Sequence, residues 1–202
     1  MPQNSPALNL QLPSKAFAPF AAGVQGDALF SQFHGSMYHQ AYTGALFAGA
    51  NPSGVTTSAG LATTYVGLCL SNPAASGKNL ILRRVAGAFI VAPATVTGFN
   101  LITGYVAAGV VTHTTPLTPF STLIGGAATA VGKLDSACTL VGTPVYSLVL
   151  GETPTATTLL AFSVDLEGSI VLAPGAYAAI GTTIAGPASG FQGSMIWEES
   201  PI

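Results

Sequence analysis

The sequence predicts an all-β protein built as an antiparallel β-sandwich. Short apolar runs rich in Val, Ile, Leu, Phe, Tyr and Thr follow one another along the chain, and these residue types favour strands. Turn-forming pairs such as Asn72-Pro73 and Pro174-Gly175 separate the runs. Little of the chain shows the spacing of an amphipathic helix, and many short strands with regular turns are typical of sandwiches.

The elements follow from this pattern in order. We expect strands over residues 41–50, 63–72, 78–92, 98–109, 136–142, 144–151, 158–167, 169–173, 176–183 and 191–199. The run from Leu159 to Leu166 alternates apolar and polar residues, which predicts one face toward solvent. A turn is expected at Glu167-Gly168, between two of these strands.

Residues 112–135 break the pattern and are predicted to form a long crossing loop. Pro116, Pro119 and the Gly125-Gly126 pair favour irregular structure. One or two helical turns are expected over Ala127 to Leu134, because alanine favours helix.

The first residues differ in composition from the rest, which predicts an extended N-terminal arm over 1–38 and a sandwich domain over 39–202. Prolines interrupt any regular element of the arm. Its aromatic residues indicate contacts with its own domain or a neighbouring subunit: Phe17, Phe20, Phe30, Phe33 and Tyr38. The alternative is an unstructured terminus in which the aromatic residues have no such role.

The chain is very poor in charge. It has five Lys or Arg and seven Asp or Glu among 202 residues, and none between Arg84 and Lys133. Soluble domains are usually about 25% charged, so we expect much of this surface to be covered.

The best membrane candidate, Val85 to Val111, contains Pro93 and strand-forming residues, so we expect no membrane partner. The net charge of -2 also argues against nucleic acid and leaves an assembly with further copies of the chain or with other proteins.

No motif predicts an enzyme, a cofactor or a metal. The stretch NPAASGKN (72–79) lacks the first glycine, the final hydroxyl and the following helix of a phosphate-binding loop. His34, His39 and His113 are not clustered with acidic residues in sequence. The neighbouring carboxylates Asp165 and Glu167 are interpreted as a solvated strand end. Cys69 and Cys138 lie in apolar runs and are expected to be buried free thiols.

Charged positions near the strands lead to further expectations. Arg83 and Arg84 are successive strand residues, so they should point to opposite faces, with at least one meeting a carboxylate or a neighbouring subunit. Trp197 should pack in the core, while Glu199 should lie at a solvated strand end and Asp135 in a turn.

Three passages resemble virion structural proteins of tailed bacteriophages. They are LSNPAASGKNLIL (70–82), LAPGAYAAIG (172–181) and GSMIWEE (193–199). The resemblance implies a jelly-roll-like sandwich, with a hairpin at Pro174-Gly175 and a closing strand at Trp197. It further implies a non-enzymatic capsid decoration (cement) protein or head fibre on the capsid surface. The resemblance also implies a homotrimer, partnered by the major capsid protein or other virion proteins. It transfers no active-site residue.

Two other functions remain open. A tail or fibre-tip module that recognises a host glycan would need an exposed groove of aromatic and polar groups. A polysaccharide-degrading enzyme would need facing carboxylates, which a chain with seven acidic residues scarcely provides.

Overall fold

A computed structural model describes residues 9–11, 17–19, 37–109, 111–156 and 158–202. The chain divides into two compact units, Met1–Tyr38 and His39–Ile202. In the first unit, β1 (Asn9–Gln11) pairs antiparallel with β2 (Phe17–Pro19). Whether the rest of this unit extends as an arm stays a prediction.

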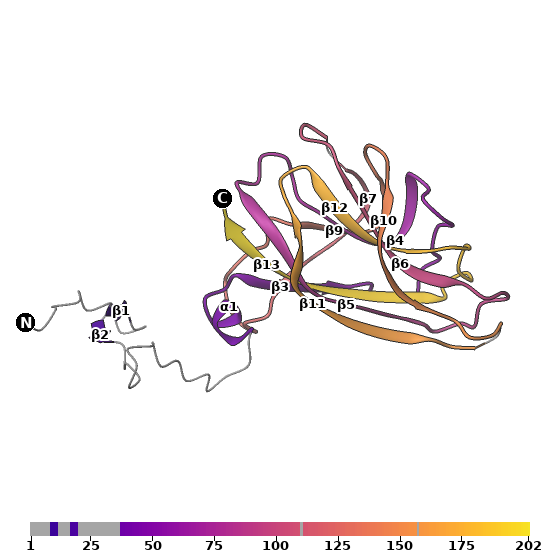
Figure 1. Cartoon of the computed structure of the whole chain (residues 1–202), viewed down its shortest axis with the longest axis horizontal. Coiled ribbons are helices and arrows are strands. Elements are labelled where there is room, and N and C mark those ends of the chain that lie inside the picture. The colour runs from indigo at the N-terminus through magenta and orange to yellow at the C-terminus, as the bar shows by residue number, and fades with distance from the viewer. Residues whose placement is uncertain (1–8, 12–16, 20–36, 110, 157) are drawn as a thin grey trace, which may run out of the picture. The chain divides into compact units, whose positions relative to one another are not determined.

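The second unit is an antiparallel β-sandwich, as predicted, and Figure 1 shows its two layers of strands. The short helix α1 (Tyr38–Tyr42) leads into it. The six-stranded sheet has the order β10-β6-β12-β4-β9-β7, and the five-stranded sheet has the order β11-β5-β13-β3-β8. The strands are β3 (Leu46–Ala50), β4 (Thr64–Ser71), β5 (Lys78–Phe89), β6 (Gly98–Tyr105), β7 (Thr112–Leu117), β8 (Phe120–Ser121), β9 (Lys133–Thr139), β10 (Val145–Glu152), β11 (Ala161–Leu172), β12 (Ala176–Thr182) and β13 (Phe191–Pro201).

The chain crosses between the sheets at most connections. The strands β3, β4, β5 and β6 alternate between the two sheets, and so do β10, β11, β12 and β13. Sequential crossing of this kind gives the sandwich its jelly-roll-like character. It also gathers the loops into two sets, one at each end of the sandwich.

The prediction of a long irregular loop at 112–135 is wrong in part. This segment holds β7, β8 and the start of β9, and none of it is helical. The threonines of β7 favour a strand. A proline is tolerated at position 116 because β7 lies at the edge of its sheet. On the open side of an edge strand, a missing backbone N–H removes no hydrogen bond to a neighbouring strand.

Two other boundaries differ from the expectation. The segment 41–50 begins in α1 and becomes a strand only at Leu46. The two strands expected at 158–167 and 169–173 are the single strand β11. Glu167 and Gly168 have φ values of 50° and 83° and form an irregularity within β11, because Asp165 lies opposite Arg84 but Ile170 lies opposite Leu82.

The core lies between the sheets and confirms the expectation for Trp197, which is fully buried with Met195 on the same face of β13. A second apolar cluster lies on the other face of the six-stranded sheet. Along β12, Ala178 belongs to the main core, whereas Tyr177 and Ala179 belong to the second cluster. The six-stranded sheet is therefore covered on both faces over part of its area.

Candidate assembly surface

Four loops meet at one end of the sandwich, which we call the loop end. They are residues 51–63, 90–97, 153–160 and 183–190, with Thr157 outside the described residues. Backbone hydrogen bonds join them: Ile90 N donates to Gly190 O (2.7 Å) and Thr153 N donates to Thr97 O (2.9 Å). Gly186 N also donates to a loop carbonyl, that of Thr57 (3.2 Å).

Buried threonine hydroxyls hold the loop end together. Thr57 Oγ1 lies 2.7 Å from Thr182 Oγ1 and accepts from Gly186 N at 2.9 Å. Thr153 Oγ1 accepts from Thr97 N at 2.9 Å. All four threonines are at most 3% exposed. Neutral hydroxyls therefore satisfy the backbone donors of these loops without any charged side chain.

The outside of the loop end is uncharged and carries exposed aliphatic side chains among serines and threonines. Its exposed aliphatic side chains range from 40% exposure at Leu61 to 58% at Leu159, and they include Ile90, Val91, Val96 and Ile184. The four loops contain no Lys, Arg, Asp or Glu. The nearest charge in sequence is the exposed Glu152, at the end of β10. Exposed aliphatic residues gathered in this way are typical of an interaction surface.

Both candidate arginines meet carboxylates of their own chain. Arg83 Nε donates to Glu198 Oε2 at 3.1 Å, while Arg84 binds both oxygens of Asp165, at 2.5 and 3.2 Å. The bond to Asp165 raises the pKa of the Arg84 guanidinium. A role for these arginines in assembly stays a prediction.

The expectation that the two arginines point to opposite faces is wrong. Between Leu82 and Arg84 the register with β13 shifts, so that Trp197 pairs with Leu82 and Ile196 pairs with Arg84. Leu82 and Val85 are buried, and both arginines between them lie on the outer face. An irregularity of this kind changes the side-chain alternation of a strand.

The aromatic residues of the first unit can be placed only in part. Phe17 begins β2, and Tyr38 begins α1 with 47% of its surface exposed. Phe20, Phe30 and Phe33 lie outside the described residues. Their contribution to assembly stays a prediction.

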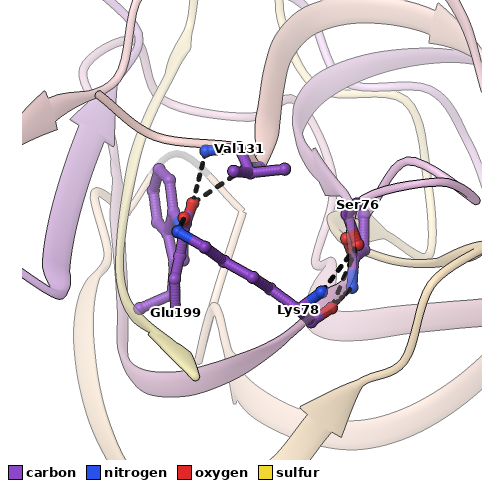
Figure 2. A network of polar contacts seen from close by, with 7 residues as sticks. Ser76, Lys78, Val131 and Glu199 are labelled. Carbon is purple, nitrogen blue, oxygen red and sulfur yellow. Dashed lines mark hydrogen bonds and ion pairs between the residues drawn. The ribbon is translucent and has the colours of Figure 1, made fainter. Parts of the chain in front are cut away.

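The expectation of a solvated Glu199 is wrong. Its side chain is buried, and Oε1 accepts from Val131 N at 2.7 Å and from Gly132 N at 2.9 Å. Oε2 lies 3.0 Å from Lys78 Nζ, and Figure 2 shows this network. Trp197 Nε1 also donates to Oε1, at 3.4 Å. Glu199 thereby joins β13, β5 and the segment before β9 at what we call the Glu199 end.

Asp135 is a second buried carboxylate that the sequence placed in a turn. It lies fully buried in β9, with Oδ2 2.7 Å from His113 Nδ1 on β7. Burial raises the pKa of the Asp135 carboxyl, and the hydrogen bond from His113 opposes that rise.

The expected burial of Cys69 and Cys138 is confirmed. The hydrogen bond to Cys138, together with burial, raises the pKa of the Cys69 thiol.

Across the described residues, no group of three His, Cys, Asp or Glu side chains is arranged to hold a metal ion. No described helix is long and apolar enough to cross a membrane.

Comparisons with protein-family models, curated proteins and solved structures found no match to this chain.

Sequence reasoning missed the loop end. A residue-by-residue search for charged or nucleophilic groups passes over threonine, valine and isoleucine. The available signal was the complete lack of charge in all four turn regions, 51–63, 90–97, 153–160 and 183–190. Only the topology places these regions together.

Proposed function

We propose that the chain is a non-enzymatic virion structural protein of a tailed phage, which decorates a capsid and stabilises it by bridging neighbouring capsomers. In this proposal it acts as a homotrimer on the capsid surface. Its partners are further copies of itself and the major capsid protein or other virion proteins.

The loop end is the observation that carries the proposal. It presents Ile90, Val96 and Ile184 without charge, on a base of buried threonine hydrogen bonds. A surface that is already ordered loses little conformational entropy when a partner covers it. We assign this surface to the contacts between subunits of the trimer.

The remaining surfaces serve attachment in this proposal. The arm residues Phe17, Phe20, Phe30, Phe33 and Tyr38 contact neighbouring capsomers, because an extended segment can add to a sheet edge of a partner. Arg83 and Arg84, on the outer face of the five-stranded sheet, lie at the border of that contact. The mechanism is mechanical: added contacts between capsomers resist pressure from inside the shell.

Electron cryo-microscopy of the virion that carries this protein tests the proposal. Decoration requires density for the sandwich at hundreds of regularly spaced positions over the shell. A few copies at a single vertex would identify a tail or fibre component instead. Density absent from the whole particle would overturn a structural role in the virion.

A further inference from the structure

A groove opens where the two sheets meet at an edge, away from the loop end. It has a volume of about 530 Å³ and is lined by residues of β6, β10, β11 and β12 and by the segments that adjoin them. Ligand pockets commonly have about 300–1,000 Å³, so the groove is large enough for a small ligand.

Hydroxyl-bearing residues from three strands and an adjoining segment line this groove. Thr103 comes from β6, Ser147 from β10 and Ser169 from β11. Thr143 comes from the segment just before β10. The hydroxyls of Thr103 and Ser147 are hydrogen-bonded to each other. Hydroxyls both donate and accept, so such a wall suits a ligand that itself carries many hydroxyls.

Among the residues that the structure describes, none that lines the groove is charged. Its lining side chains are hydroxyl-bearing, apolar or glycine, without Lys, Arg, Asp, Glu or His. A phosphate, sulfate or carboxylate ligand would find no cation there to compensate for its lost hydration. The chemistry of the walls therefore selects a neutral ligand.

One aromatic ring stands beside these hydroxyls. Tyr105 lines the groove and is 60% exposed, so its ring is accessible to a ligand. Val145 and Val171, 50% and 51% exposed, add apolar surface to the same lining. Tyr177 also borders the groove, but its ring belongs to the second apolar cluster.

We propose that this groove binds a neutral oligosaccharide. A sugar ring offers an apolar C–H face to Tyr105 and hydroxyls to Thr103, Ser147 and Ser169. The aromatic ring supplies apolar contact area, and the hydroxyls fix orientation. This site is independent of the capsid role: a decoration protein with or without it would still bridge capsomers.

A printed array of neutral, sialylated and sulfated oligosaccharides, followed by calorimetric titration of the best neutral compound, tests the proposal. The wild-type protein should bind neutral compounds and not the acidic ones. Tyr105→Ala should weaken binding at least about tenfold, equivalent to about 1.4 kcal/mol. Ser169→Tyr, at an exposed strand position, should fill the groove and abolish binding.

Tyr146→Ala is the matched control, because Tyr146 is also an exposed tyrosine near this edge (42%) but does not line the groove. It should bind like the wild type, and all three variants should melt like the wild type. The proposal is overturned if no neutral oligosaccharide binds, or if acidic compounds bind better. It is also overturned if Tyr105→Ala and Tyr146→Ala have the same affinity.

Discussion

The two ends of the sandwich are held together by different chemistry. At the loop end, Thr57 and Thr153 accept backbone hydrogen bonds from neighbouring loops. At the Glu199 end, one buried carboxylate accepts from two backbone amides and pairs with Lys78. Both arrangements join segments far apart in sequence, but only one of them uses charge.

This difference explains how a chain with so few charges can be ordered and still present an uncharged surface. Charged residues of the sandwich are used in internal pairs such as Lys78–Glu199, Arg83–Glu198 and Arg84–Asp165. The loop end obtains its order from neutral groups, so its exterior is left free of charge. In our account, that exterior is where subunits meet.

The largest expected effect is at the Glu199 end. Glu199→Ala leaves the Lys78 ammonium and the amides of Val131 and Gly132 without their acceptor. Lys78 keeps 34% of its side chain in solvent and adds little, but each backbone amide left without its acceptor costs about 1–3 kcal/mol, which gives about 2–6 kcal/mol for the two. The free energy of unfolding, measured with urea, should fall by that amount.

Glu198→Ala is the control for this substitution, since Glu198 is the preceding residue on the same strand but pairs with Arg83 on the outer face. This pair is partly buried (22% and 16% exposed), but no described backbone amide donates to Glu198, so its loss should lower the free energy of unfolding by less than the loss of Glu199. Equal losses for the two glutamates would show that the Glu199 network does not hold this end.

A smaller effect is expected at the loop end. Thr57→Val keeps the shape of the side chain but removes the acceptor for Gly186 N and the partner of Thr182 Oγ1. Gly186 N keeps its longer bond to the Thr57 carbonyl (3.2 Å), and Thr182 Oγ1 keeps Ser58 O (3.4 Å), so no donor is left without an acceptor. The expected cost is the net worth of one hydrogen bond, about 0.5–1.5 kcal/mol, and the melting temperature should fall accordingly. Thr155→Val, at an exposed position of the same end, should change the free energy of unfolding by less than about 0.5 kcal/mol. If Thr57→Val melts with the wild type, hydroxyls do not order these loops.

The smallest effect concerns Asp135, a buried carboxylate that belongs to neither end. Its folded pKa is raised above the ordinary 3.8, so the folded protein holds this proton more tightly than the unfolded chain. The stabilisation from protonation is complete below the unfolded pKa and is lost as the pH rises through the folded pKa.

Asp135→Asn stays neutral and can still hydrogen-bond His113. As the pH rises from about 3.8 toward 7, the melting temperature of the wild type should fall relative to that of this variant. A difference in melting temperature that is constant over this range would mean that Asp135 has no raised pKa.

The sequence predicted the fold class because strand-forming runs and turn pairs are local features. The strand beginning near Lys78 follows from its strand-forming residues, and the burial of Trp197 follows from alternation along its strand. The irregularities at Arg83 and at Glu167 could not be predicted in this way, because they depend on register with neighbouring strands. The strand at 112–117 was missed because Pro116 is compatible only with an edge, and edges are defined by topology.

The candidate surface was still less accessible to sequence reasoning. A lack of charge predicts that some surface is covered, but it does not say which. Glu199 was expected at a solvated strand end and Asp135 in a turn, because their partners, Val131 and His113, come from distant segments. Ordinary residues such as Val96 and Ile184 gain a role only because the fold gathers them at one end.

Sedimentation equilibrium at micromolar concentration tests the central claim most directly. The wild-type protein should sediment as a trimer. Val96→Glu combined with Ile184→Glu places two charges on the loop end and should give a folded monomer with the wild-type melting temperature. Val149→Glu, at a 72% exposed position of β10, should remain trimeric. A monomeric wild type, or a trimer that survives both loop-end charges, would contradict the account.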